Sequence, residues 1–347
     1  MVAHKTQRMK DVRHYNLLCH NTFGIIAHCR RFVEFDTEEQ LEELCHSLTD
    51  ADHPIMVLGG GSNLLLTKDF DGTVIHSAIK GIEKTQDTKE HVLVRVGSGE
   101  VWDDFVARCV DEGWYGAENL SLIPGEVGAS AVQNIGAYGA EVKDIIYKVE
   151  AMEIASGRKV EIANAECHYS YRQSLFKTEW KGRYIITHVT YRLSKSFTPR
   201  LDYGNILAEL QSEGVLSPTP QQLRDVIIKI RREKLPDPEV EGNAGSFFMN
   251  PVVSREKYDE LAAQYPNMPH YDVDADSVKI PAGWMIDQCG WKGRTVGRAG
   301  VHAKQALVLV NRGGATGEEV VNLCHLIQED VKSKFGIEIK PEVNICG

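Results

Sequence analysis

Apolar residues recur at helical or strand spacing along most of the chain, so the sequence predicts alternating helices and strands. Residues 37–48 carry apolar side chains three and four positions apart behind a capping box, which predicts an amphipathic helix. The apolar run 54–58 predicts a buried strand. It leads directly into the glycine turn 59–63, and another apolar run follows at 64–66. The first part of the chain is therefore expected to have an α/β arrangement.

The middle of the chain predicts further strands around one helix. Valines alternate with other residues at 92–96, as in a half-buried strand. Residues 101–112 have helical spacing and are followed by Gly113, a typical helix end. A turn at 156–157 predicts a hairpin, and alternation over 185–191 predicts another strand.

The last third of the chain starts after a proline-rich stop. A helix that begins at Thr219 is expected to end at 235–238, Leu-Pro-Asp-Pro, which is the clearest domain boundary in the sequence. A helix around 258–265 and a strand at 306–310 follow. A final helix is predicted over 316–336, with a capping box at its start and a glycine at its end.

Two glycine-rich stretches are candidates for ligand binding. The turn 59–63 follows a buried strand and exposes successive N–H groups, which can form a nest for an anion. It is neither a Walker loop nor a Rossmann fingerprint, because Leu64 stands where the fingerprint needs a small residue. Residues 113–139 are expected to form a long irregular loop, which in a compact domain is usually functional. A dinucleotide could bind between the two stretches, although most glycine turns are only turns.

The sequence GNAGSFFMNP at 242–251 raises the question whether Ser246 is a turn residue or a reagent. Glycines let the backbone approach a ligand closely, whereas the aromatic pair after the serine needs burial. Taken alone, the stretch is typical of a loop that enters a strand. It lacks the second glycine of the G-x-S-x-G elbow, which argues against a serine hydrolase.

Composition limits the class of protein. A chain of 347 residues is expected to form two or three domains, and 42% hydrophobic and 25% charged residues are typical of a soluble globular protein. No apolar run approaches the ~20 residues of a membrane helix, and the basic N-terminus lacks a secretion signal. A cytoplasmic protein is therefore expected. The net charge of -10 disfavours general nucleic-acid binding.

The cysteines do not predict a metal site. The 8 cysteines contain no C-x-x-C pair and are typical of reduced thiols in a cytoplasmic protein. Cys45, Cys167 and Cys324 are each followed by histidine. Because adjacent side chains on a helix diverge and the spacings of a zinc site are absent, no metal is expected.

Seven motifs together carry a resemblance to a known family. In chain order they are GGGSN, IPGEVGASAVQNIGAYG, YRQSLFK, RREKLPDP, GNAGSFFMNP, AGWMIDQCG and KQALVLVN. In this order they resemble the UDP-N-acetylenolpyruvoylglucosamine reductases (MurB), from about Asn16 to Ile345. Their joint occurrence is highly specific where each motif alone is not. The chain is similar to the branch that keeps a tyrosine-containing loop, here LDYGN at 201–205.

The resemblance implies an α+β fold and a division into domains. Two lobes are expected to bind FAD in a vanillyl-alcohol-oxidase-like (PCMH-like) fold, and a separate α+β domain is expected to bind substrate. The expected segments are a disordered lead-in at 1–15, the first FAD-binding lobe at 16–80 joined by a C-terminal strand at 337–347, the second lobe at 81–235 and the substrate-binding domain at 236–336.

The resemblance also implies a reaction and its catalytic residues. NADPH reduces bound FAD, which delivers hydride to the enolpyruvyl double bond of UDP-N-acetylglucosamine enolpyruvate. The product is UDP-N-acetylmuramate, a precursor for peptidoglycan and cell-wall synthesis. Charge develops on the carbon beside the carboxylate, so an enolate must be stabilised and then protonated. Ser246 matches the family's proton donor, Arg172 the enolate clamp and Glu342 the third catalytic residue.

Other positions match the family's binding residues. Tyr203, Lys234, Asn250 and Gln305 align with positions that hold the nucleotide-sugar diphosphate and, in part, the nicotinamide cofactor. Lys234 belongs to a basic patch that suits a diphosphate but is also typical of a solvated helix end. The expected cofactor-binding residues are Gly59, Gly60, Gly61, Ser62, Asn63, Pro124, Gly125, Gly128, Asn134, Ile135, Gly136 and Gly139.

The expected protein is a monomer that binds neither nucleic acid nor membrane. Two alternatives stay open. One is another FAD oxidoreductase of the same fold class that acts on a different small acid, and the other is a nucleotide-sugar-binding protein without turnover.

Overall fold

The computed structural model describes residues 9–347, which divide into two compact units. Both units combine segments that are distant in sequence. Unit 1 contains the segment that ends at Tyr15, Cys29–Gly60 and Asp71–Arg231, and unit 2 contains Asn16–His28, Gly61–Phe70 and Arg232–Gly347. The division therefore falls within the predicted glycine turn, between Gly60 and Gly61.

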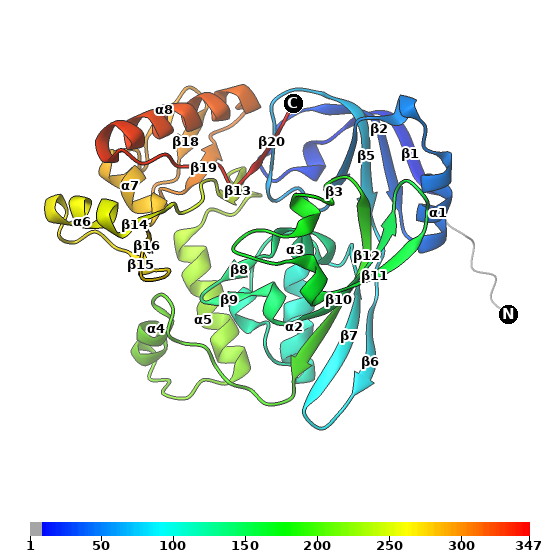
Figure 1. The fold of residues 1–347 in the computed structure, drawn as a ribbon, viewed down its shortest axis with the longest axis horizontal. Helices are drawn as coiled ribbons and strands as arrows, with labels where there is room; N and C mark the ends of the chain where they lie inside the picture. Colours follow the sequence, from blue (N-terminus) through cyan, green and yellow to red (C-terminus); the bar gives the residue numbers. More distant parts are fainter. Residues whose placement is uncertain (1–8) are drawn as a thin grey trace. The chain divides into compact units, whose positions relative to one another are not determined.

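A four-stranded sheet and the helix α1 (Glu38–Ser47) form one core of unit 1. Leu41 and Leu44 of the helix are fully buried in the same core as Ile75 of the sheet. Thr37 caps α1 by accepting a hydrogen bond from Gln40 N, which confirms the predicted helix start. In spatial order the strands are β1 (Lys10–Asn16), β2 (His28–Phe35), β5 (Phe70–Ser77) and β3 (Ile55–Leu58) (Figure 1).

An antiparallel five-stranded sheet forms the second core of unit 1 with the helices α2 (Trp102–Glu112) and α3 (Val127–Gln133). Alternation predicted half-buried strands, but the central strand is buried on both faces. The reason is that Val189 packs into this core, whereas Ile185 packs into the core of the four-stranded sheet. In spatial order the strands are β11 (Lys159–Ala163), β10 (Ile146–Glu153), β12 (Tyr184–Ser194), β7 (His91–Gly97) and β6 (Ile82–Asp87).

The remaining helices and strands of unit 1 are short, apart from one long helix. The helix α5 (Pro220–Lys234) ends where the proline-rich stop predicted, and it packs its buried apolar face against α4 (Ile206–Ser212). The strands β8 (Gly136–Ala137) and β9 (Ala140–Glu141) form a small hairpin. The 3-10 helices of the chain are Leu18–His20, Asp50–Asp52, Glu118–Leu120, Val142–Asp144, Asn164–Cys167 and Leu175–Lys177.

Unit 2 contains three small sheets. In spatial order the first contains β13 (Asn243–Ser246), β19 (Val308–Asn311), β18 (Ala299–Val301) and β17 (Thr295–Val296). The second contains β14 (Val252–Ser254), β16 (Ser277–Lys279) and β15 (Tyr271–Asp272). The third is the parallel pair of β4 (Leu64–Leu66) and β20 (Asn344–Cys346), which joins the C-terminus to the segment after the glycine turn.

Three helices complete unit 2, namely α6 (Arg255–Gln264), α7 (Ala282–Gln288) and α8 (Gly317–Phe335). The predicted capping box of α8 is confirmed, since Thr316 accepts a hydrogen bond from Glu319 N while the Glu319 carboxylate accepts one from Thr316 N. Gly336 ends the helix at a φ of 67°, a conformation that glycine adopts without a steric penalty.

Two sequence predictions are wrong in detail. The lead-in was expected to be disordered up to residue 15, but Lys10–Asn16 forms β1, while residues 1–8 lie outside the described part of the chain. Residues 113–139 were expected to be irregular, yet they contain the helix α3. None of the helices within residues 9–347 is both long enough and apolar enough to cross a membrane.

Candidate active site

Two predicted glycine-rich loops touch each other in unit 1. A Cβ atom on Gly60 would lie 3.3 Å from the Cα atom of Gly125, and one on Gly59 would lie 3.2 Å from the Cβ atom of Ala129. Side chains at positions 59 and 60 would therefore crowd the contact between the loops. The structure therefore brings the first glycine turn into contact with the second glycine stretch, the two stretches between which the sequence predicts that a dinucleotide could bind.

Other glycines of the predicted cofactor site serve the fold itself. Gly61 has a φ of 64°, and a Cβ atom there would lie 2.0 Å from the carbonyl oxygen of His20 in the same unit. A Cβ atom on Gly128 would lie 2.8 Å from the Cβ atom of Ser98. These two glycines allow close approach of protein segments, so protein packing alone accounts for them.

We expect Gly61→Ala to lower the free energy of unfolding by at least about 1–3 kcal/mol, because a left-handed conformation and a backbone clash act together. Flavin content should fall with it. Gly60→Ala is the matched control, since its nearest neighbour lies at 3.3 Å and needs to move by only a few tenths of an ångström. Urea unfolding and flavin absorbance of both variants check this expectation. Equal losses in both variants would contradict it.

Arg172 is held in a fixed orientation within unit 1. Its backbone has a φ of 56°, and its Nη2 donates a hydrogen bond of 2.5 Å to the carbonyl oxygen of Gly136. Its Nη1 lies 3.4 Å from the carbonyl oxygen of Asn134. A Cβ atom at position 136 would lie 2.7 Å from Arg172 Nη1, so this glycine makes room for the guanidinium. The structure therefore brings the predicted catalytic residue Arg172 into contact with Gly136 and Asn134, which were predicted to bind the cofactor.

The sequence places Arg231 in the basic patch of Lys234, but the structure gives this arginine a different setting. Burial lowers the pKa of Arg231, interactions with Tyr138 and Asp103 oppose this, and the charge of Arg172 lowers it further. Arg231 Nε also donates to the carbonyl oxygen of Leu122 at 3.3 Å. The only sequence signal was its place in the RREKLPDP motif.

The predicted residues Asn134 and Tyr203 differ in what their side chains contact. Asn134 is fully buried, donates from Nδ2 to the carbonyl oxygen of Ser170 and accepts from Lys143 N. The side chain of Asn134 therefore links backbone segments of the protein by hydrogen bonds. Tyr203 is 42% exposed, and its Cβ atom lies 3.4 Å from the Cβ position of Gly139. The tyrosine-containing loop therefore packs against the end of the second glycine stretch.

Ser246 ends β13 in unit 2 with its side chain exposed. Gly245 before it has a φ of 68° and open space around its Cβ position, whereas Phe247 after it is fully buried. The close approach at Gly242 is to the carbonyl oxygen of Phe23, 2.2 Å from a Cβ position, so protein packing rather than a ligand explains that glycine. A buried aromatic and the pairing of Ser246 with Val308 of β19 fix the backbone of the serine.

Glu342 lies beside the serine segment. Its N–H donates to the carbonyl oxygen of Phe247 at 2.8 Å, one residue after Ser246. Its own carbonyl oxygen accepts from Asn63 Nδ2 at 3.4 Å. Unit 2 therefore brings together two predicted catalytic residues and the end of the glycine turn, although they are separated by up to 279 positions in sequence.

Asn250 and Gln305 are each held at their carbonyl end. Asn250 Oδ1 accepts from Ala282 N at 2.9 Å, and Gln305 Oε1 accepts from Leu307 N at 3.2 Å. Phe247 N donates to Leu307 O, which brings the Gln305 loop to the serine segment. The amide nitrogens of both side chains are the ends that can donate to a ligand.

The residues of the predicted basic patch, which are Lys229, Arg231, Arg232 and Lys234, differ in what they contact. Lys229 forms ion pairs with Glu209 and Glu213, whereas Arg231 donates a hydrogen bond to the carbonyl oxygen of Leu122. Lys234 is exposed at the end of α5. Arg232 lines a cavity of about 720 Å³ in unit 2. The described lining of this cavity includes Lys304 but none of the predicted catalytic residues, so it does not extend the serine site.

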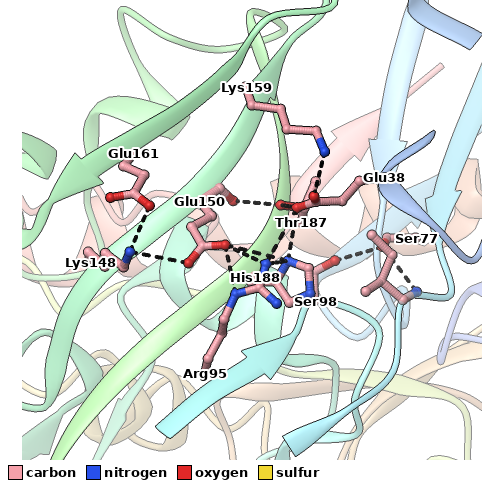
Figure 2. A network of polar contacts seen from close by, with 11 residues as sticks. Glu38, Ser77, Arg95, Ser98, Lys148, Glu150, Lys159, Glu161, Thr187 and His188 are labelled. Carbon is pink, nitrogen blue, oxygen red and sulfur yellow. Dashed lines mark hydrogen bonds and ion pairs between the residues drawn. The ribbon is translucent and has the colours of Figure 1, made fainter. Parts of the chain in front are cut away.

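A separate polar cluster in unit 1 brings three potential metal ligands close together. Ligand atoms of Glu38, Glu150 and His188 all lie within 4.8 Å of one another, the one such group found in residues 9–347. Figure 2 shows that Arg95 reaches into this cluster. Its Nη2 donates to Glu150 Oε2 at 2.6 Å and lies 2.9 Å from His188 Nδ1. Lys159 also pairs with Glu38, so protein cations already balance the carboxylates.

We expect the free energy of unfolding to fall through His188 as the pH falls below about 6.5, the ordinary pKa of a histidine. Burial, followed by the charge of Arg95, lowers the pKa of His188 from its ordinary value, against the effect of both carboxylates. The unfolded chain therefore takes up the proton first, and stability falls as the pH falls below the unfolded pKa. His188→Asn keeps an acceptor for Arg95 and should flatten this dependence in urea unfolding, whereas exposed His325→Asn should not. An unchanged slope in His188→Asn would contradict the assignment.

All 8 cysteines are free thiols, and five of them are buried, as the sequence predicted for reduced cysteines. Burial raises the pKa of Cys29 and of Cys45 to about 11. These thiols are therefore poor nucleophiles and poor metal ligands at neutral pH.

Two protein families match the chain. The FAD binding domain matches residues 29–163, and the C-terminal domain of UDP-N-acetylenolpyruvoylglucosamine reductase matches residues 237–346. The chain is 56% identical to the UDP-N-acetylenolpyruvoylglucosamine reductase of Bacteroides fragilis (strain YCH46) over 331 residues, 95% of this chain and 98% of that protein. It is 47% identical to the enzyme of the same name from Burkholderia vietnamiensis over 328 residues, 94% of each chain.

A solved structure agrees with these relatives. The UDP-N-acetylenolpyruvylglucosamine reductase of Thermus caldophilus matches with a TM-score of 0.67 and 23% identity, covering 98% of this chain and 99% of that one. At this identity the likeness shows the fold, and together with the FAD binding domain it confirms the predicted α+β FAD-binding fold with a further domain. The sequence identity to the relatives extends along nearly the whole chain, which therefore belongs to the UDP-N-acetylenolpyruvoylglucosamine reductase family.

Proposed function

We propose that the chain is an NADPH-dependent, FAD-containing reductase that converts UDP-N-acetylglucosamine enolpyruvate to UDP-N-acetylmuramate, a precursor of peptidoglycan. The observation that carries this proposal is 56% identity over 95% of the chain to a relative named for this substrate. A monomeric, cytoplasmic enzyme is part of the same proposal.

The two contacting glycine loops of unit 1 suit FAD. Gly60 and Gly125 meet closely, and glycine-rich backbone of this kind can present N–H groups to a diphosphate. We assign the diphosphate of FAD to these loops, with Pro124 at the start of the second. When bound, FAD would take a hydride from NADPH and supply it to the double bond of the substrate.

Ser246 has the properties of a proton donor to the carbon beside the substrate carboxylate. Its side chain is exposed, while its backbone is fixed by pairing with β19. A hydroxyl is a weak acid, so it can serve only a strongly basic acceptor such as a carbanionic centre. The same chemistry requires that the proton arrives after the hydride.

Arg172 and Glu342 are assigned the roles that their motifs have in the family, the enolate clamp and the third catalytic residue. The guanidinium of Arg172 is planar and oriented by the carbonyl oxygen of Gly136, which suits two parallel hydrogen bonds to a carboxylate. The backbone of Glu342 is held next to Phe247, so its carboxyl group would contact the same reaction intermediate as the hydroxyl of Ser246. In this role it donates a hydrogen bond as a neutral acid.

The remaining predicted residues are assigned to the nucleotide sugar. Tyr203 offers an exposed ring and hydroxyl, and Lys234 offers an exposed charge for the diphosphate. Asn250 and Gln305 offer amide nitrogens whose orientation is set by bonds to their carbonyl oxygens. Together these side chains would hold the uridine diphosphate while the enolpyruvyl group reacts.

One anaerobic experiment tests the function. The purified protein should show flavin absorbance, NADPH should bleach it, and the enolpyruvyl substrate should restore it with formation of UDP-N-acetylmuramate, detected by mass spectrometry. Bleaching without reoxidation would favour another flavin oxidoreductase that acts on a different acid. Binding of the nucleotide sugar without any flavin signal would favour a binding protein without turnover.

A further inference from the structure

A histidine that the proposed mechanism does not use lies beside the first glycine turn. His76 is on β5, and its Cα atom pairs with that of Leu58, the last residue of β3 before Gly59. Its side chain is 12% exposed. The histidine is therefore fixed next to the strand end that leads into the turn.

Both ring nitrogens of His76 face carboxylates. Nδ1 lies 2.9 Å from Glu34 Oε2, and Nε2 lies 3.1 Å from Glu126 Oε1. A neutral imidazole can donate from one nitrogen only, whereas the imidazolium donates from both. Burial lowers the pKa of His76, but the hydrogen bonds and charges of Glu126 and then Glu34 outweigh it and raise the pKa above its ordinary value. Geometry and charge both favour the protonated ring.

Glu126 connects this histidine to the glycine loops. It follows Gly125, and its Oε2 lies 3.3 Å from the Cβ position of Gly59. Its Cγ lies 3.8 Å from the Cβ position of Gly60. A carboxylate thus touches the turn to which we assign the FAD diphosphate. Because the diphosphate is itself an anion, an uncompensated charge on Glu126 would repel it.

Besides the two carboxylates, the side chain of His76 contacts an aromatic ring. On the β1 side, the amino group of Lys10 lies over the rings of Tyr15 and Phe32, and the Phe32 ring stacks at 6.3 Å from the ring of His76. The strand β3 carries no titratable side chain. A histidine proton is a charge that pH removes near neutrality, so the positive charge that His76 places between the two carboxylates depends on pH.

We propose that His76 is a positioning residue for FAD, whose imidazolium neutralises Glu126 and holds it against the first glycine turn, so that binding of the diphosphate is coupled to a proton. This inference rests on the proposed function, because it uses the assignment of the glycine loops to FAD. The protonated cluster of His76, Glu34 and Glu126 carries one net negative charge, and the deprotonated cluster carries two. Deprotonation therefore increases the repulsion at the site of the cofactor.

The coupling has a definite sign. FAD binding favours the protonated cluster, so the cofactor should bind with uptake of a proton when the pH exceeds the pKa of His76 in the apoprotein. The dissociation constant of FAD should then rise by up to about tenfold per pH unit. The raised pKa of His76 also contributes to the free energy of unfolding. This contribution is lost as the pH rises through the pKa of His76 in the folded protein.

Titration of the full-length apoprotein with FAD, followed by flavin fluorescence between about pH 6 and about pH 9, tests this coupling. His76→Gln should bind FAD more weakly than the unsubstituted protein at the lowest pH of this range, and its affinity for FAD should not depend on pH. Glu126→Gln should bind FAD tightly at all pH values, and the double variant should regain the affinity that His76→Gln loses. Exposed His46→Gln is the matched control and should behave as the unsubstituted protein does. Calorimetry in buffers of different ionisation enthalpy should measure the proton uptake.

The outcomes separate this inference from the function on which it rests. FAD binding that does not vary with pH in the unsubstituted protein would overturn the inference alone. The same pH dependence in His76→Gln, or no recovery in the double variant, would also overturn it, because a merely structural histidine would not be rescued by loss of a carboxylate. If no FAD binds at any pH, the proposed function fails, and the inference fails with it.

Discussion

Replacing Ser246 with alanine is expected to slow reoxidation of the flavin by the enolpyruvyl substrate about a hundred- to ten-thousand-fold, the usual contribution of a positioned acid. Reduction by NADPH should remain nearly unchanged, because the hydroxyl acts only after the hydride has left. The fold should survive, since Ser246 is exposed and its neighbours Phe247 and Val308 keep the strand in place.

Anaerobic stopped-flow measurements of the two half-reactions check this expectation. Ser333→Ala is the matched control, because it removes an exposed hydroxyl from α8 in the same unit and should change neither half-reaction. Equal losses in both half-reactions of Ser246→Ala would remove the proton-donor role and indicate a binding role for the serine.

Arg172→Lys is expected to lower kcat by about a hundredfold or more while changing KM much less. A lysine keeps the charge but loses the planar fork, so it cannot hold a carboxylate by two parallel hydrogen bonds. The loss should therefore appear in the transition state more than in binding.

Steady-state kinetics with saturating NADPH measure both parameters. The matched control is Arg183→Lys, which changes an exposed arginine of the same unit that pairs with Glu153. A rise in KM without a fall in kcat would make Arg172 a binding residue and place the enolate clamp elsewhere. Thermal unfolding of both variants excludes a simple loss of the fold.

Local sequence signals predicted the helices whose ends carry their own chemistry. Thr37 at α1 and Thr316 at α8 accept the backbone hydrogen bonds that a capping residue provides, and Gly336 ends α8 in the left-handed conformation. These effects act over a few residues and need no tertiary contact. The helix α3 was missed because it is only 7 residues long and contains glycine, so it has little helical preference of its own.

Strand burial and register could not be obtained from spacing. Alternation predicted half-buried strands, but β12 lies between two cores that form from distant segments, with Val189 in one and Ile185 in the other. The strand β1 lies in the basic segment before Asn16, and it gains its structure from pairing with β2 rather than from its own apolar residues. Pairing partners are a property of the fold and not of the strand.

The sequence by itself determined the family, through motifs that occur together in one order, and with it the FAD-dependent chemistry and the candidate residues Ser246, Arg172 and Glu342. Such motifs can be recognised in sequence because each catalytic role needs a particular side chain. Only the tertiary structure decided what surrounds them. It placed the carbonyl oxygen of Gly136 against Arg172 and the charge of Glu126 between His76 and the glycine turn. Orientation and pKa depend on groups brought together from distant positions, and no local pattern encodes those distances.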